Sequence, residues 1–379
     1  MRAANSRGRW RWALLIGVCA AVVALAATLG APVPISDLWS PDPIRVDVAR
    51  HIFWRADGQW GLRPTRVLAG LLVGACLAAS GAALQAVFRN PLAEPYLLGT
   101  SAGGALGATL GLALQSRAAL ITASLAATAT TATNTAATSM AAAQASLGGA
   151  FLNAFDLPSA LAFCGSLAAT VLVYALGQRR MSTHAGGGSF DRASLLLSGV
   201  AISSFLSALM SLVVSLFNRS DLARQVMFWL LGGLTNVSPA QNILLLFSLC
   251  LGLPILSLSA RDLNALRLGD EEARALGVSV GALHRRLLVV AALMSSAAVA
   301  SAGLIGFVGL LAPHLLRGLF GSDARTLAPA SALGGAALLV GCDAVARSIA
   351  RPQEIPVGII TALLGVPLFL ALARRGAGA

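Results

Sequence analysis

The sequence contains no lysine, so all 27 of its basic residues are arginines. A nucleotide-binding P-loop uses the lysine of GxxxxGK[ST] to reach the phosphates, and Schiff-base chemistry needs a lysine amine. This chain therefore carries neither a standard ATP site nor a Schiff-base nucleophile. The four histidines (His51, His184, His284 and His314) have no obvious carboxylate orienter nearby in the sequence. We expect no catalytic residues and no enzymatic activity in this chain.

Charged residues are also scarce. They make up 11% of the chain, whereas 57% of its residues are hydrophobic and its mean hydropathy is +0.79. Soluble domains carry roughly 25% charged residues, so this composition indicates an integral membrane protein. The five cysteines are isolated and form no CxxC pair or metal-ligand spacing. We therefore expect no disulfide, no metal site and no cofactor in this chain.

Apolar segments near the roughly 20 residues that a spanning helix needs recur along the chain. The first, Ala13–Ala31, is longer than the roughly 7–15 residue core of a signal peptide, so we expect a retained span. The predicted fold is an all-α polytopic membrane protein, a single transmembrane domain over residues 1–379 with about ten transmembrane helices. The predicted spans are 12–31, 65–87, 96–116, 155–177, 194–217, 240–259, 284–304, 306–320, 327–349 and 356–373.

Arginines cluster where connections between these spans are expected. The clusters fall within 2–11, 179–192, 261–286 and 374–375. With about ten spans and both termini in the cytoplasm, all of these clusters lie on one side, in agreement with the positive-inside rule. Attraction to anionic membrane lipid accounts for the net charge of +12. We therefore expect no nucleic-acid partner.

Residues 117–154 form an Ala/Thr/Ser tract with almost no charge. Its threonines and low complexity favour a loosely ordered outer-loop insertion over a stable helix. No chemistry is assigned to it.

The segment 260–283 holds three neighbouring carboxylates, Asp270, Glu271 and Glu272. Asp270 is a suitable N-cap, and Gly277 can end a short helix in the left-handed conformation. A helix of one to two turns does not stand alone in water, so it packs against the membrane domain or contacts another protein. The residues alone support a docking element and a loop helix without a partner about equally.

Asp343 is the one carboxylate that the sequence places deep within a span. Intramembrane carboxylates serve proton-coupled carriers, so a proton-coupled secondary transporter using Asp343 is the alternative function. Arg347 lies four residues later, on the same helical face. An internal ion pair is the simpler interpretation of this carboxylate.

Several motifs, in order and at matching spacing, resemble the FecCD/BtuC-like permeases, the membrane subunits of bacterial ABC importers for vitamin B12, haem and iron–siderophore complexes. Two departures are visible: the first motif has Arg-Pro-Thr-Arg in place of the usual Arg-Leu-Pro-Arg, and the tract at 117–154 looks like an insertion. The matching motifs are Arg63–Arg66, Ser80–Gln85, Asn90–Gly99, Leu195–Gly199, Phe228–Gly232, Gly269–Gly277, Gly306–His314, Asp343–Arg347 and Glu354–Gly358.

The resemblance implies a subunit of ten spans in the bacterial inner membrane, which forms a homodimer and moves its substrate by alternating access at the dimer interface. Two cytoplasmic ABC ATPase subunits, which hold the ATP and Mg, and one periplasmic substrate-binding protein would complete the importer. This agrees with the missing lysine, because the chain needs a partner to use ATP.

The resemblance also assigns roles to residues. Arg63, Arg66 and Arg347 match outer-face arginines that dock the binding protein, although for Arg347 this role competes with the internal pair to Asp343. Asn90 and Leu92 match inner-gate positions, and the loop 186–193 would be a second gate. The loop 260–283 would be the cytoplasmic coupling loop. Its predicted ATPase-coupling residues are Asp270, Glu271, Glu272, Ala273, Arg274, Leu276 and Gly277.

The substrate is left open between three metal chelates: haem, which we favour, then a ferric siderophore, then vitamin B12. His314 would be tempting as a haem ligand. Its Pro-His pair belongs to the general pattern of the family as the resemblance has it, so a structural role at a helix end is the preferred interpretation.

Overall fold

The structure is a computed structural model that describes residues 2–28, 62–129, 156–182, 192–217, 220–350 and 353–376. Within these ranges the chain is helical, with one short 3-10 helix and no strand. The elements are α1 (Arg2–Thr28), α3 (Leu62–Phe88), η2 (Pro95–Leu98), α4 (Thr100–Ala129), α7 (Leu157–Ser182), α8 (Arg192–Phe217), α9 (Ser220–Leu230), α10 (Pro239–Leu258), α11 (Ala260–Leu266), α12 (Asp270–Ala275), α13 (Val280–Ala302), α14 (Val308–Phe320), α15 (Ala324–Ile349) and α16 (Val357–Gly376).

Each of the predicted spans coincides with a helix, which confirms the predicted all-α membrane fold. In the part of the chain that is described, seven helices are long and apolar enough to cross a membrane: α1, α3, α7, α8, α10, α13 and α15. The predicted spans at 96–116, 306–320 and 356–373 correspond to α4, α14 and α16.

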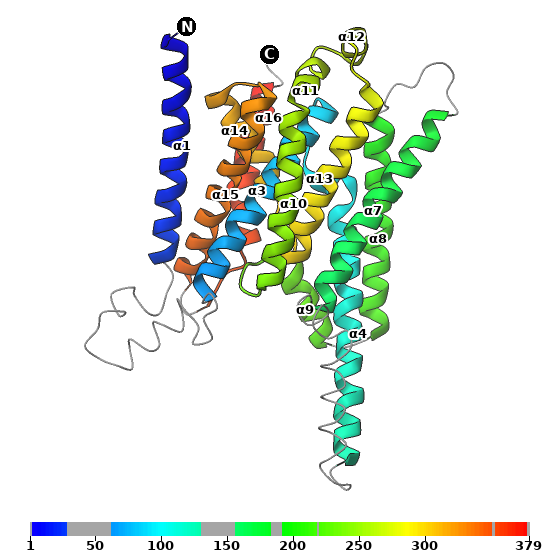
Figure 1. The fold of residues 1–379 in the computed structure, drawn as a ribbon. Helices are drawn as coiled ribbons and strands as arrows, with labels where there is room; N and C mark the ends of the chain where they lie inside the picture. Colours follow the sequence, from blue (N-terminus) through cyan, green and yellow to red (C-terminus); the bar gives the residue numbers. More distant parts are fainter. Residues whose placement is uncertain are drawn as a thin grey trace, which may run out of the picture.

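The helices form one bundle around α3, α13 and α15, which are mostly buried. Figure 1 shows α1 and α8 at opposite edges of this bundle. Large apolar side chains on α8 are exposed, among them Phe205 and Leu216. A polytopic protein presents such a surface to lipid or to another subunit, since backbone polar groups are already paired within the helix.

Glycines allow the central helices to approach closely. A Cβ on Gly74 of α3 would collide with the backbone of Gly335 in α15, and one on Gly81 would collide with the backbone of Gly309 in α14. Small residues at such crossings are the usual means of packing helices tightly in a membrane. They fix α3 between α14 and α15.

The two ends of the bundle differ in what they carry. At one end, which we call the α12 end, lie α11, α12, the start of α1 and the end of α16 (Figure 1). The opposite end, which we call the α9 end, carries α9 and the start of α3. The predicted coupling loop, 260–283, therefore lies at the α12 end, and Arg66, one of the predicted docking arginines, lies at the α9 end.

Two segments differ from the sequence-based expectation. The helix α9 lies outside the predicted spans, with Leu222 and Val226 buried and Asp221 and Arg224 exposed. The helix α4 continues through Ala129, so the beginning of the predicted loose loop is helical. The remainder of that tract lies outside the described residues.

Candidate functional site

The acidic helix α12 exists, but its first turn is capped differently from the prediction. The N-cap is Gly269, and Asp270 is the first helical residue. The Asp270 carboxylate is instead 3.0 Å from the Arg89 guanidinium. The prediction of Asp270 as N-cap was wrong because a charged partner from α3, distant in sequence, engages its side chain.

The end of α12 is as predicted. Gly277 has a φ of +83°, the left-handed conformation that favours glycine. Its N–H donates to the Arg274 carbonyl at 2.9 Å, and the Val278 N–H donates to the Ala273 carbonyl at 2.9 Å. These two bonds form a Schellman motif, which closes the helix and turns the chain toward α13.

One face of α12 packs on the bundle and the other is exposed. Ala273 is fully buried and belongs to the main hydrophobic core. Glu271, Glu272 and Arg274 are exposed. Leu276 is also exposed, at 65%. Ala273 thus anchors α12 to the membrane domain, and a partner protein can contact only the other predicted coupling residues.

The predicted inner-gate residues lie in a tight turn between α3 and η2. The Asn90 side-chain oxygen accepts the Leu92 N–H at 2.9 Å, and the Asn90 carbonyl accepts the Ala93 N–H at 3.1 Å. An asparagine that bonds its own backbone two residues later makes an Asx turn, which Pro91 reinforces. The chain therefore leaves α3 in a tight turn at these residues. The second predicted gate, 186–193, lies largely outside the described residues.

Arg89 is a site residue that the sequence analysis missed. Its Nε and Nη2 atoms donate to the Leu266 carbonyl of α11, at 3.0 and 2.7 Å, and Nη2 is also paired with Asp270 of α12. One indication of its importance was visible in the sequence, since Arg89 directly precedes the predicted gate residue Asn90. The pairing partner could not be identified from spacing, because Asp270 lies far along the chain.

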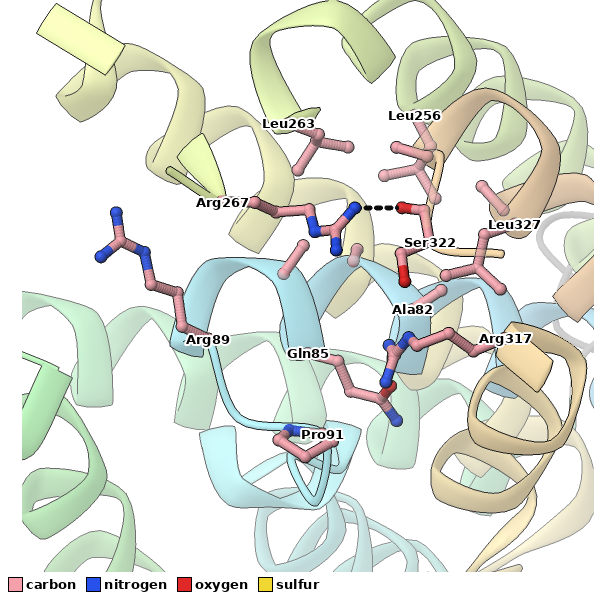
Figure 2. A pocket seen from close by; sticks show the side chains of 14 residues that line it. Ala82, Gln85, Arg89, Pro91, Leu256, Leu263, Arg267, Arg317, Ser322 and Leu327 are labelled. Atoms are coloured by element: carbon pink, nitrogen blue, oxygen red, sulfur yellow. Dashed lines mark hydrogen bonds between the residues drawn. The ribbon is translucent and has the colours of Figure 1, made fainter. Parts of the chain in front are cut away.

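A cavity of about 300 Å³ lies beside this turn. Figure 2 shows Gln85 and Arg317 close together on one side of it, with Arg267 facing them and Pro91 at its edge. Arg317 donates to the Gln85 amide oxygen at 2.8 Å, and Arg267 donates to the Ser322 carbonyl at 2.8 Å. Arg267 and Arg317 thus bond neutral oxygens at the border of this cavity.

At the α9 end, Arg66 joins two carboxylates, each of which lies far from Arg66 in sequence. Its guanidinium lies 2.8 Å from Asp343 and 2.8 Å from Glu354. Arg347 is 2.9 Å from the other oxygen of Asp343, so the internal ion pair considered for Arg347 is present. These four residues form what we call the outer ion cluster.

The side chains of the outer ion cluster differ in their exposure to solvent. The side chains of Asp343 and Arg347 are 3% and 5% exposed, whereas that of Glu354 is 45% exposed. Burial opposes ionisation of Glu354, but the hydrogen bond and positive charge of Arg66 outweigh it and lower the pKa of Glu354. The side chain of Arg63 lies outside the described residues.

A second cavity, of about 440 Å³, opens beside the outer ion cluster. Polar side chains from α3, α9 and α10 line it together with Glu354, and Trp229 contributes an aromatic wall. Its polar lining residues include Arg66, Asp156, Arg224, Gln225, Gln241 and Glu354. Among the described residues no cluster of three His, Cys, Asp or Glu side chains has the geometry of a metal site.

His314 lies in the middle of α14, not at a helix end. The expectation of a helix-end role was wrong because Pro313 is accommodated inside the helix, which continues to Phe320.

Comparison with known proteins identifies a matching family and several relatives of this chain. The FecCD transport family profile matches residues 13–145 and 119–375. The chain is 38% identical to the hemin transport system permease protein HmuU of Yersinia pestis, over 84% of this chain and 85% of that protein. It is 39% identical to the cobalamin import system permease protein BtuC of Halobacterium salinarum, over 83% of this chain and 72% of that protein.

A solved structure shares the whole fold. A metal-chelate type ABC transporter described in an inward-facing conformation superposes with a TM-score of 0.71 at 27% identity, covering 96% of this chain and 99% of that one. The bundle of Figure 1 is therefore the fold of an ABC transporter permease.

Proposed function

Because this chain belongs to the FecCD transport family, we propose that it forms the membrane pathway of an ABC importer that carries a metal chelate from periplasm to cytoplasm. Two copies of the chain would form a homodimer in the bacterial inner membrane. The substrate would pass along their interface by alternating access, with Asn90 and Leu92 at the inner gate. Two cytoplasmic ATPase subunits would supply the energy.

The observation that carries this proposal is the exposed face of α12. A short helix is fixed to the bundle by Ala273 and ended by a Schellman motif, while Glu271, Glu272 and Leu276 face outward. An exposed leucine beside exposed acids suits a protein contact, in which apolar residues form the centre and charges the rim. We therefore place the α12 end in the cytoplasm, with the loop 260–283 as the contact for the ATPase.

Docking of a periplasmic binding protein would occur at the α9 end, through Arg63, Arg66 and Arg347. Arg66 and Arg347 already bind Asp343, so replacing either would also break a buried ion pair. Docking is therefore tested with Arg63→Glu. This substitution should weaken binding of the cognate binding protein, and unchanged affinity at low salt would contradict the role of Arg63.

Haem remains the favoured substrate. A relative at 38% identity is named for hemin transport, while others at similar identity are named for cobalamin or vitamin B12 import. Parallel uptake of haem, a ferric siderophore and vitamin B12 by the assembled importer would distinguish the three.

The proposal is tested by the affinity of the partner ATPase for the permease in lipid nanodiscs. Reversing Glu271 and Glu272 to lysine should weaken this affinity by about tenfold, since close charges at an interface contribute about 1.4 kcal/mol or more. Asp221→Lys on α9 is the matched control, because Asp221 is an exposed carboxylate at the opposite end. Equal affinity of the reversed and control variants would contradict the assignment of α12.

The alternative, a proton-coupled carrier centred on Asp343, finds less support. The Asp343 carboxylate faces two guanidiniums, those of Arg66 and Arg347. A proton carrier must bind and release its proton during transport, whereas the Asp343 carboxylate is already engaged in two ion pairs within the bundle. Uptake that persists without ATP and collapses with a protonophore would favour the alternative.

A further inference from the structure

The turn after α3, residues 89–96, is held at its first end by Arg89. One guanidinium binds the last carbonyl of α11, that of Leu266, through two donors, and binds the Asp270 carboxylate in the first turn of α12. Carbonyls at a helix C-terminus lack partners within the helix, so a cation is favourable there. A single side chain from α3 thus ties both short helices to the turn.

The other end of the same turn is tied to the centre of the bundle. The Glu94 carboxylate accepts the Phe307 N–H at 2.6 Å. The Tyr96 hydroxyl donates to the Ile305 carbonyl at 2.8 Å and accepts the Ile305 N–H at 2.9 Å. Residues 303–307 are the non-helical crossing between α13 and α14, so the turn connects this crossing to α11 and α12.

Backbone strain is concentrated at the two ends of this connection. Among the described residues, the non-glycine residues with positive φ are Arg89 at 48° and Phe307 at 68°. Such conformations cost free energy and persist only where surrounding contacts enforce them. Arg89 begins the turn, and Phe307 is the residue that Glu94 binds.

The turn also has room to move. Arg89 and Pro91 border the cavity of about 300 Å³, whose other walls come from the last turns of α3 and from α10, α11, α14 and the start of α15. In Figure 2 the Arg89 guanidinium points away from Gln85 and Arg317, while Pro91 lies at the edge of the cavity. A shift of the turn toward this side meets unfilled volume rather than packed atoms.

We propose that Arg89 is a positioning residue that transmits displacement of α11 and α12 to the turn 89–96, and through Glu94 to the crossing 303–307. This inference rests on the proposed function, because an ATPase partner supplies the displacement. Arginine suits the role since its planar fork binds a carbonyl and a carboxylate at once, whereas lysine presents a single ammonium. Arg89 thus joins the proposed coupling residues of α12, and it lies in the same turn as the predicted gate residues Asn90 and Leu92.

The test measures uptake and ATP hydrolysis together in proteoliposomes containing permease, ATPase and binding protein. Arg89→Gly removes the tie but accommodates the positive φ at little cost. It should lower the amount of substrate moved per ATP by about fivefold or more, the lower range of typical coupling effects. Arg89→Lys should retain part of this ratio, and Asp270→Asn should lower it to a smaller extent than Arg89→Gly.

The control is Arg325→Gln, an exposed arginine in the first turn of α15 at the same end. Its ratio should equal that of the wild type. A merely structural Arg89 predicts that Arg89→Gly, by relieving strain, leaves transport per ATP unchanged, and that result would overturn the proposal. Absence of ATP-driven uptake by the wild type would instead contradict the proposed function.

A second measurement does not depend on transport. In nanodiscs containing permease alone, amide hydrogen exchange of α12 should be faster in Arg89→Gly than in the wild type by about fivefold or more, while Arg325→Gln should match the wild type. Equal exchange of α12 in Arg89→Gly and wild type would show that Arg89 does not hold this helix, and would overturn the inference.

Discussion

At the residue scale, the outer ion cluster shows how a membrane bundle keeps charges inside it. Asp343 is nearly inaccessible yet faces Arg66 and Arg347, while Glu354 shares Arg66 from the exposed side. A buried charge is tolerated only when its partners and hydrogen bonds are all present. The cluster therefore joins α3, α15 and the segment before α16 at one point.

Replacing Asp343 should have a large effect on stability. Asp343→Asn removes the carboxylate shared by the buried Arg347 and the part-buried Arg66, which should lower the free energy of unfolding by about 3 kcal/mol. Unfolding in detergent micelles measures this loss. Asp221→Asn is the control, because its pair with Arg224 is exposed at 69% and 77% and its removal should change stability by less than about 0.5 kcal/mol. Equal losses for the two variants would contradict the account.

Glu354 gives the cluster a pH dependence. Its pKa is lowered in the folded chain despite partial burial, because Arg66 favours its ionised form. A depressed folded pKa contributes stability above the unfolded pKa, and this contribution is lost as the pH falls through the folded value. The midpoint of thermal unfolding of wild type should exceed that of Glu354→Gln at neutral pH. The difference should begin to shrink near about pH 4, the ordinary range of glutamate, and vanish only below the lowered pKa of Glu354 in the folded chain. A difference that grows on acidification would contradict this.

At the element scale, the sequence predicted those structural features that depend on residues close to one another along the chain. The apolar runs predicted the helices, and Gly277 predicted the end of α12, since both follow from nearby residues. The prediction of Asp270 as N-cap was wrong because Arg89, which lies at the end of another helix, binds the Asp270 carboxylate. The pairing of Arg66 with Glu354 likewise bridges 288 residues, a distance that no periodicity or spacing can specify. The amphipathic α9 was not placed as a helix because its polar residues interrupt the apolar pattern.

Gly277 offers a test of α12 as an element. Alanine in the left-handed conformation costs about 1 kcal/mol, which corresponds to about a fivefold change in an equilibrium constant. Gly277→Ala should therefore weaken ATPase binding about fivefold. Gly318→Ala is the control, because Gly318 lies in α14, outside the loop 260–283, without positive φ and with open space around its Cβ position. Affinities that are equal in the two variants would mean that the geometry of α12 does not determine docking.

At the scale of the whole molecule, the two ends of the bundle differ in the groups that they present. The α12 end presents a short helix with outward acids and leucine, and the α9 end presents a polar cavity beside the outer ion cluster. The turn 89–96 connects α12 to the crossing 303–307 between α13 and α14. The chain has no lysine for a P-loop, and in the proposed importer a separate ATPase would supply the energy.

Substrate uptake into proteoliposomes tests this claim most directly. The vesicles would contain the permease, with or without its ATPase and binding protein, and would be supplied with haem, a ferric siderophore or vitamin B12 in parallel. The account predicts uptake of one chelate that requires both the ATPase and ATP and persists when a protonophore is added. Uptake by the permease alone that a protonophore abolishes would contradict it.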